Sequence, residues 1–161
     1  MQLIGILHDI RSVHNVGSIF RTADGVGFEK LYLCGITPAP VDRFKKIRPD
    51  FAKVALGAEK SVVWESVPDV VPLVKKLKKE GWKIFAIEQA KNSMPYYLAS
   101  DVLWNDEHQK AALVVGNEVG GIPPAILKLA DAILEIPMLG KKESLNVSVA
   151  FGIAAYRSRF H

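Results

Sequence analysis

The chain contains very little of what cross-links proteins or binds metals. Cys34 is the single cysteine, which excludes an internal disulfide and is consistent with a reducing compartment. The four histidines show no metal-ligand spacing, and the sequence has no cluster of cysteine and histidine. We therefore expect no metal site.

Long hydrophobic runs are absent as well. No apolar run approaches the roughly 18 residues that are needed to span a bilayer. The segment Met1 to Gly5 has neither a basic region nor a cleavage site, so no signal peptide is expected. These absences argue against a membrane partner and favour a cytoplasmic location.

The overall composition is typical of a globular protein, with 49% hydrophobic and 24% charged residues. A chain of 161 residues is long enough for one α/β domain with a substantial core and too short for two comfortable ones. We expect a single domain over residues 1–161.

Strand-like and helix-like segments alternate along the sequence. This alternation, with near-continuous apolar strands, predicts an α/β fold with a mostly parallel sheet and helices on both faces. The predicted strands are Leu3–Leu7, Lys30–Cys34, Ser61–Trp64, Trp82–Ile87, Ala111–Val115 and Ala132–Ile136. The predicted helices are Asn15–Val26, Pro49–Leu56, Asp69–Glu80, Pro124–Ala130 and Leu145–Ser158.

The most informative stretch runs from Ile136 to Ala150. A strand is closed by Pro137, a glycine-bearing loop follows, and a helix begins on Ser-Leu-Asn. Ser144 or Asn146 could cap that helix, which would gather free backbone N–H groups and a hydroxyl at one place. Such a loop can hold a small polar ligand, although an ordinary strand–loop–helix connection has the same pattern.

A second segment, from Asn15 to Arg21, opens an amphipathic helix after the first strand. Apolar residues recur at helical spacing, which places Asn15 as a candidate N-cap. Arg21 lies about a turn and a half into this helix and therefore points to a fixed side. Taken alone, Arg21 is more simply interpreted as a solvated or salt-bridged surface arginine.

A third segment, Gly116 to Pro123, follows the apolar strand at Ala111–Val115. Its glycines permit a close approach of the backbone. It is neither a Walker loop, because no Lys-Ser/Thr follows, nor a dinucleotide-binding G-x-G-x-x-G. Glu118 is either a turn carboxylate or a hydrogen-bond acceptor in a site. Since ligands bind beyond the carboxyl ends of strands, we expect all three segments to meet at one rim of the sheet.

Together the segments resemble the three ordered motifs of the SpoU (TrmH-like) family, which belongs to the SPOUT class of RNA methyltransferases. The matching motifs are N-x-G-S-x-x-R from Asn15, G-N-E-x-x-G from Gly116, and I-P-M-x-G-x-x-x-S-L-N-V-S-x-A from Ile136. The resemblance extends from about Leu7 to Tyr156. Some members of the family carry an extra N-terminal RNA-binding domain; because the first motif here begins by residue 15, the resemblance implies none in this chain. After Tyr156, Arg-Ser-Arg stands where many relatives carry an acidic residue, and no function is drawn from that difference.

The resemblance implies methyl transfer from S-adenosylmethionine to the ribose 2′-hydroxyl of a tRNA or rRNA nucleotide. It also implies a C-terminal trefoil knot and no metal. The implied catalytic residues are Asn15, Arg21, Glu118, Ser144 and Asn146. The implied cofactor-binding residues are Gly116, Asn117, Glu118, Gly121, Ile136, Met138, Ser144, Leu145 and Asn146. In the family the arginine acts as a base or as a phosphate-assisted base; a phosphate clamp is the physical alternative, because guanidinium stays protonated.

The formal net charge of +4 makes a polyanionic partner plausible. The stretch Arg43–Arg48 is basic, with Phe44 and Phe51 interleaved in and beside it. The candidate RNA-binding residues are Arg11, Arg21, Arg43, Lys45, Lys46 and Arg48. In contrast, the lysines of the helix Asp69–Glu80 are most simply a solvated face.

The helix Leu145–Ser158 is apolar nearly all round, which requires cover on both sides. A core helix in a thick domain would satisfy this requirement, and the resemblance favours a homodimer built on the helix. Two other functions remain as alternatives. One is a catalytically weak RNA-binding member of the family, and the other is a nucleotide-binding oxidoreductase, which the missing dinucleotide fingerprint disfavours.

Overall fold

The computed structural model describes residues 1–99 and 109–160. Its centre is a seven-stranded sheet with the order β3-β2-β1-β6-β4-β7-β5, in which every pairing is parallel. The strands are β1 (Gln2–His8), β2 (Lys30–Cys34), β3 (Trp64–Val67), β4 (Lys83–Ile87), β5 (Met94–Pro95), β6 (Lys110–Val115) and β7 (Ala132–Glu135). The predicted parallel sheet is therefore confirmed.

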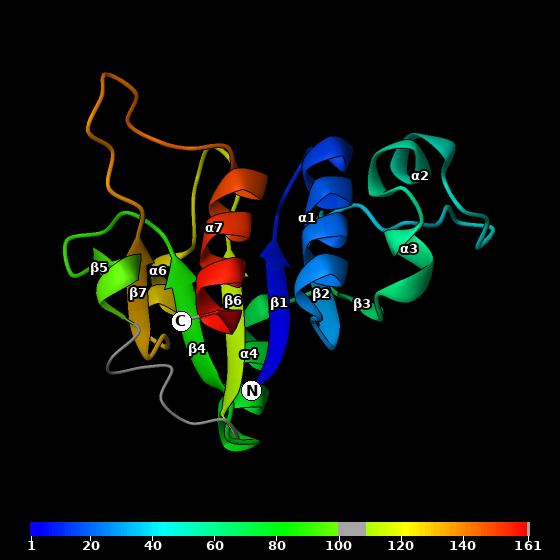
Figure 1. Cartoon of the computed structure of the whole chain (residues 1–161). Helices are drawn as coiled ribbons and strands as arrows, with labels where there is room; N and C mark the ends of the chain where they lie inside the picture. The colour runs from blue at the N-terminus through cyan, green and yellow to red at the C-terminus, as the bar shows by residue number, and fades with distance from the viewer. Residues whose placement is uncertain (100–108, 161) are drawn as a thin grey trace.

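Helices cover both faces of this sheet, as predicted (Figure 1). One face carries α1 (Val13–Val26) and α7 (Val147–Arg159), with α2 (Pro49–Ala55) and α3 (Ala58–Ser61) packed outside α1. The other face carries α4 (Val70–Lys79) and α6 (Pro124–Leu127). A short 3₁₀ helix, η1 (Tyr96–Leu98), follows β5.

The buried residues form a separate apolar layer on each side of the sheet. In β1, Leu3 and Leu7 join the layer under α1 and α7, whereas Ile4 and Ile6 join the layer under α4. This alternation follows from the two-residue period of a strand. Because both faces are covered, the central strands are apolar on both sides.

The third predicted strand is wrong in position. Ser61 ends helix α3, and the strand itself runs over Trp64–Val67, where it pairs with Leu31–Cys34 of β2. The hydroxyl of Ser61 also contacts Asp24 of α1 at 2.5 Å. Val62 and Val63 are β-branched and would fit a strand at the predicted position. Pairing with β2 and the packing of α3 therefore determine where β3 begins.

The C-terminal end of α7 is fastened to the end of α1. Arg159 donates hydrogen bonds to the carbonyl oxygens of Val26 at 3.1 Å, Gly27 at 2.9 Å and Met1 at 2.9 Å. These acceptors include carbonyls that the C-terminus of a helix leaves unsatisfied. Arg159, within the Arg-Ser-Arg segment that follows Tyr156, therefore has a structural role in this chain.

Candidate functional site

The three sequence motifs meet at the carboxyl-end edge of the sheet, and Asn15 joins them. Its side-chain nitrogen Nδ2 donates to Oε1 of Glu118 at 3.0 Å, and its Oδ1 accepts from Nδ2 of Asn146 at 3.1 Å. One nearly buried amide thus bridges residues that lie 103 and 131 positions away in the chain. The predicted convergence of the motifs on one rim is present in the structure.

Asn15 does not cap its helix, so that prediction was wrong. The N-cap is Ser12, whose hydroxyl accepts a hydrogen bond from the backbone N–H of Asn15 at 3.1 Å. Helix α1 begins two residues earlier than predicted, at Val13. Because the Ser12 hydroxyl accepts the hydrogen bond at the start of α1, the side-chain amide of Asn15 is available to bond Glu118 and Asn146.

Glu118 holds the start of α1. Its carboxylate accepts hydrogen bonds from the backbone N–H groups of Arg11 at 3.2 Å and Ser12 at 3.3 Å, in addition to that from Asn15. Burial raises the pKa of this carboxyl, but hydrogen bonds to the charged form outweigh burial and leave the pKa below its usual value. Of the two roles considered for Glu118, the structure supports the hydrogen-bond acceptor.

Asn146, and not Ser144, caps helix α7. Its Oδ1 accepts hydrogen bonds from the backbone N–H of Ser148 at 2.9 Å and from the hydroxyl of Ser148 at 2.7 Å. Its other side-chain atom, Nδ2, faces Asn15. The same amide therefore fixes the first turn of α7 and ties it to α1.

The loop from Gly116 to Ile122 folds tightly onto itself. Asn117 donates to the carbonyl oxygen of Asp9 at 2.7 Å, and its own Oδ1 accepts from Val119 and Gly120, both at 2.9 Å. A Cβ atom at Gly116 would come within 2.4 Å of the carbonyl group of Gly121, so only glycine fits that position.

Glu88, which sequence reasoning missed, fixes the far side of this loop. Its carboxylate accepts hydrogen bonds from the backbone N–H of Gln89 at 3.0 Å and of Ile122 at 2.9 Å. Gly121 has a φ of 65°, and a Cβ there would lie 2.4 Å from the Glu88 carboxylate. Glu88 directly follows β4, so the rule that sites lie beyond the carboxyl ends of strands could have identified it.

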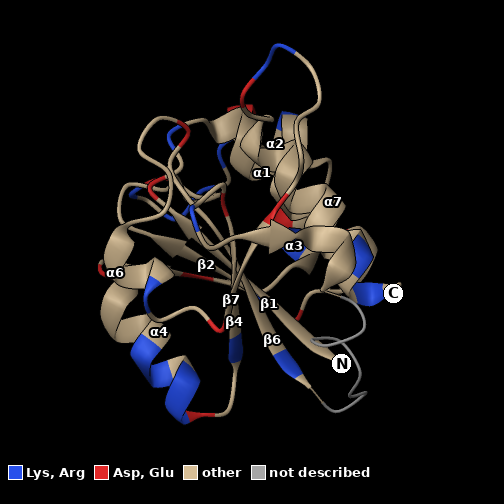
Figure 2. Cartoon of the chain, turned by 90° about the vertical axis from the view of Figure 1, so that its left-hand side faces the viewer, with Lys and Arg blue, Asp and Glu red and all other residues tan. Residues whose placement is uncertain are grey.

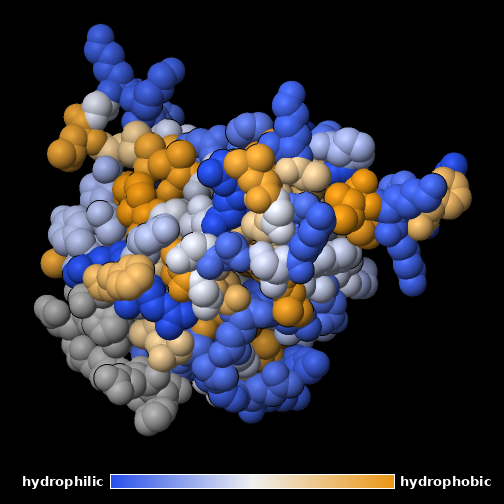
Figure 3. All heavy atoms as spheres, turned by 45° about the vertical axis from the view of Figure 1, so that its right-hand side comes forward, coloured by the Kyte–Doolittle hydropathy of each residue, from blue (hydrophilic) through white to orange (hydrophobic). Residues whose placement is uncertain are grey.

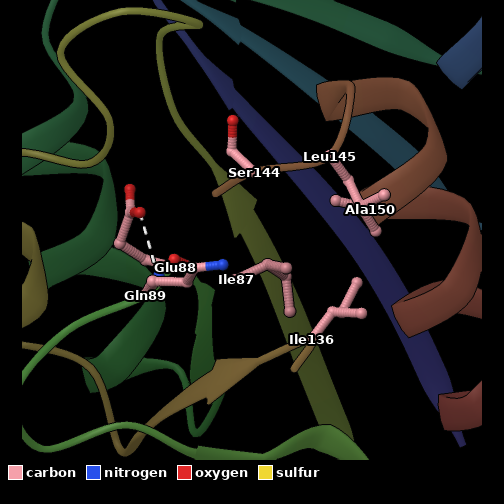
Figure 4. Close-up of a pocket in the computed structure, with 7 residues that line it drawn as sticks. All are labelled: Ile87, Glu88, Gln89, Ile136, Ser144, Leu145 and Ala150. Carbon is pink, nitrogen blue, oxygen red and sulfur yellow. Dashed lines mark hydrogen bonds between the residues drawn. The ribbon is translucent and has the colours of Figure 1, made fainter. Parts of the chain in front are cut away.

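Cavities line the edge between these loops and helix α7. The first is mostly apolar, and Figure 4 shows Ile87, Ile136, Leu145 and Ala150 around it, with the Glu88 carboxylate bonded to the Gln89 backbone on its other side. A second cavity, of about 360 Å³, shares residues with the first and extends to Gly116, Asn117 and Glu118. A third, of about 400 Å³, follows the loop after β7. Their shared lining makes them one groove.

Most of the predicted cofactor-binding residues line this groove. They are Gly116, Asn117, Glu118, Ile136, Met138, Ser144, Leu145 and Asn146. Gly121 stands behind the lining, against Glu88. The groove also contains residues that were not predicted, among them Ile87, Glu88, Gln89, Val147 and Ala150.

Arg21 does not line the groove. Its side chain is exposed on α1, and within the described part of the chain it makes no hydrogen bond or ion pair. Its neighbour Thr22 lies opposite Gly152 of α7, so this part of α1 runs along α7. The guanidinium is therefore free to meet a ligand that approaches the α1–α7 side of the molecule.

The basic stretch forms a projecting loop next to α2, which we call the finger and define as residues 41–47. Arg43, Lys45 and Lys46 are exposed in it. Arg48, by contrast, is half-buried and pairs with Asp50 at 2.7 Å; its hydrogen bond lowers the pKa of that carboxyl. Phe51 is fully buried, so the finger presents only one of the two predicted aromatic residues to solvent.

A separate group of lysines, Lys75, Lys76, Lys78 and Lys79, belongs to α4. Figure 2 shows them along α4, on the opposite face of the sheet from α1 and α7. Lys78 is bonded to Asp131 at 3.0 Å, whereas Lys75 and Lys79 are exposed. Their position on the outer side of an amphipathic helix agrees with a solvated face.

Within residues 1–99 and 109–160, no group of three or more His, Cys, Asp or Glu residues could hold a metal ion. No helix in this part is long and apolar enough to cross a membrane. Two of the four histidines, His108 and His161, lie outside the described residues.

Comparison with known proteins gives a consistent set of matches. The model of the SpoU rRNA Methylase family matches residues 2–156. The chain is 33% identical over 157 residues to a tRNA (guanosine(18)-2'-O)-methyltransferase of Aquifex aeolicus, covering 98% of this chain and 68% of the relative. It is 32% identical to the 23S rRNA (guanosine-2'-O-)-methyltransferase RlmB of Bordetella pertussis, covering 97% of this chain and 58% of the relative.

Among solved structures, an AdoMet-bound rRNA methyltransferase from Sinorhizobium meliloti superposes with a TM-score of 0.85 at 24% identity. The match covers 98% of this chain and 56% of that one. At this identity the likeness supports the fold. This chain spans little more than half the length of the Bordetella and Sinorhizobium proteins.

Proposed function

Because the chain belongs to the SpoU rRNA Methylase family, we propose that it transfers a methyl group from S-adenosylmethionine to the 2′-oxygen of a ribose in tRNA or rRNA. The observation that carries this proposal is the bridge at Asn15, which ties the three family motifs around one groove. Membership of the family excludes the nucleotide-binding oxidoreductase.

The residues of the groove fit S-adenosylmethionine. Its apolar part, between Ile87, Ile136 and Leu145, suits an adenine ring. Its polar part contains the carboxylates of Glu88 and Glu118, and the described residues that line these two cavities include no lysine or arginine. A cationic ligand is therefore favoured there. When bound, the cofactor supplies an electrophilic methyl group, so the reaction needs alignment and the removal of one proton.

Arg21 would act on the RNA. A guanidinium stays positively charged in proteins, so Arg21 is a poor base. We prefer a role in which it holds a substrate phosphate or stabilises negative charge on the 2′-oxygen, while a phosphate oxygen accepts the proton. Its exposed position on α1, without a described partner, leaves it available for this role.

We further propose that two copies of the chain complete the site. In α7, Phe151 and Ala154 are buried against the body of the protein, whereas Val149, Tyr156 and Phe160, which directly follows the helix, are 49%, 50% and 66% exposed. This outward apolar face supports a homodimer built on α7. A dimer would also explain why Arg21 lies beside α7 and outside the groove of its own protomer.

The dimer is tested by Val149→Glu. An acidic residue in the first turn of a helix is favourable, so the isolated chain should fold normally. In a dimer the same charge would be buried at the interface, and sedimentation velocity should show a shift to monomer. An unchanged dimer would show that the interface does not lie on this face of α7. Lys75→Ala, on α4, is the control that should leave the oligomer as it is.

Family membership also leads us to expect the C-terminal segment to form a trefoil knot. We further propose that the protein acts in the cytoplasm, where its single cysteine would stay reduced.

The activity is tested by incubating the protein with labelled S-adenosylmethionine and total RNA. Methylation of the ribose blocks alkaline hydrolysis, so the label should appear in alkali-resistant dinucleotides. Label found only on bases would contradict the proposal. RNA binding without any label would support the alternative of a catalytically weak RNA-binding member of the family. Mass mapping of modified riboses in RNA from cells with and without the gene would then identify the nucleotide.

The finger is predicted to contribute to RNA docking through phosphate contacts. Lys45→Ala combined with Lys46→Ala should weaken RNA binding and reduce the dependence of affinity on salt, because two cations that displace counterions are lost. Affinity for S-adenosylmethionine should not change. Lys75→Ala with Lys79→Ala, which removes the same charge from α4, is the matched control. Equal salt slopes in both double variants would show that the finger is an ordinary solvated loop that makes no phosphate contacts.

A further inference from the structure

Phe44 is exposed at the tip of an ordered turn. Its side chain is 67% exposed, and the guanidinium of Arg43 lies 4.8 Å from the centre of its ring. In Figure 3 the finger projects from the right-hand side of the molecule and carries both hydrophilic and hydrophobic residues. Much of the ring is therefore accessible to a ligand.

Hydrogen bonds fix the conformation of the finger. Oδ1 of Asp42 accepts from the backbone N–H groups of Phe44 at 2.8 Å and Lys46 at 3.0 Å. The backbone of Asp42 bonds to that of Lys45 and Lys46, and Val41 pairs with Ile47 in an antiparallel bridge. Lys45 adopts a φ of 60°, which turns the chain sharply. The ring of Phe44 is therefore presented by a preorganised turn.

The base of the finger is anchored to the helix that carries the site. Arg48 donates its backbone N–H to the carbonyl of Pro40 at 2.9 Å and precedes the first residue of α2. In α2, Phe51 packs edge-on against Phe20 of α1, with ring centres 5.1 Å apart. The finger projects at the same end of the sheet as the start of α1, on the far side of α1 from α7 (Figure 1).

We propose that the finger binds an unpaired nucleotide of the RNA substrate by stacking its base on Phe44, with Arg43, Lys45 and Lys46 near the adjoining phosphates. This inference rests on the proposed function. Exposed aromatic rings bind bases through their faces, and cations beside them bind the backbone. Bases within a duplex are already stacked, so a single ring at a loop tip selects unpaired ones. The cluster of cations argues for RNA over an uncharged protein surface.

The test compares a hairpin RNA with an unpaired loop and a fully paired duplex of the same length, with affinity measured by fluorescence anisotropy. Phe44→Leu keeps an apolar side chain but loses the stacking surface, so binding of the hairpin should weaken roughly tenfold or more. Binding of the duplex and the salt slope should remain those of the unmodified protein, because no charge is removed. Phe44→Trp should retain hairpin binding, and its additional tryptophan fluorescence should be quenched by that RNA.

Val63→Ala, which trims another exposed apolar side chain, is the matched control and should bind both RNAs normally. An equal loss on hairpin and duplex, or no loss in Phe44→Leu, would overturn the stacking role. If the unmodified protein binds and methylates RNA while Phe44→Leu behaves identically, only this inference fails. If the unmodified protein binds no RNA, the proposed function fails with it.

Discussion

In Arg21→Ala we expect single-turnover methylation of RNA to fall by ~100-fold or more, the size of effect seen when a positioned charge that acts on the transition state is removed. Affinity for S-adenosylmethionine should stay within a few-fold. The physical reason is that Arg21 lies on the exposed side of α1 and outside the lining of the groove. Cofactor titration and rapid-quench kinetics measure the two quantities separately.

Thermal melting should show little change in Arg21→Ala, because the side chain makes no described contact that the fold would lose. Lys75→Ala, which removes an exposed cation from α4, should retain full turnover and serves as the control. A loss of cofactor binding in Arg21→Ala would contradict the assignment and place the arginine among the groups that hold S-adenosylmethionine.

In Asn146→Ala we expect both cofactor affinity and stability to fall. The amide caps α7 through Ser148 and bonds to Asn15, so its removal frees the first turn of the helix beside the groove. Loss of the cap should cost ~1 kcal/mol of the free energy of unfolding. Thermal or denaturant melting measures this change, and cofactor titration measures the change in affinity.

Asn146→Asp separates the two roles of this side chain. A carboxylate can still accept the hydrogen bond from the Ser148 backbone, but it cannot donate to Oδ1 of Asn15. Stability should therefore recover in Asn146→Asp while cofactor affinity remains low. Normal cofactor affinity in Asn146→Ala would show that the bridge to Asn15 does not shape the groove.

Hydrogen bonds between side chains of the three motifs hold the site together. Glu118 and Asn117 bind the segment that leads into α1, Asn146 opens α7, and Asn15 connects Glu118 to Asn146. The groove is thus bounded by loops whose positions depend on one another. Substitution of any of these side chains should alter the shape of the groove, whereas substitution of Arg21 should not.

Local patterns in the sequence were sufficient for the parallel sheet, for helices on both of its faces and for the groove at the carboxyl ends of its strands. The reason is that periodicity and burial on both faces are properties of short segments. Of the residues predicted to hold the cofactor, most line the groove because they directly follow strands or begin α7.

Only the tertiary structure decided what the individual side chains do. Asn15 was predicted to be a cap and is a bridge, because its partners are more than a hundred residues away and no local pattern contains them. Phe44 and Phe51 look alike in the sequence, but packing against Phe20 buries one and leaves the other at the tip of the finger. Similarly, β3 begins where β2 can pair with it. Long-range contacts choose among conformations that local preferences leave nearly equal in free energy.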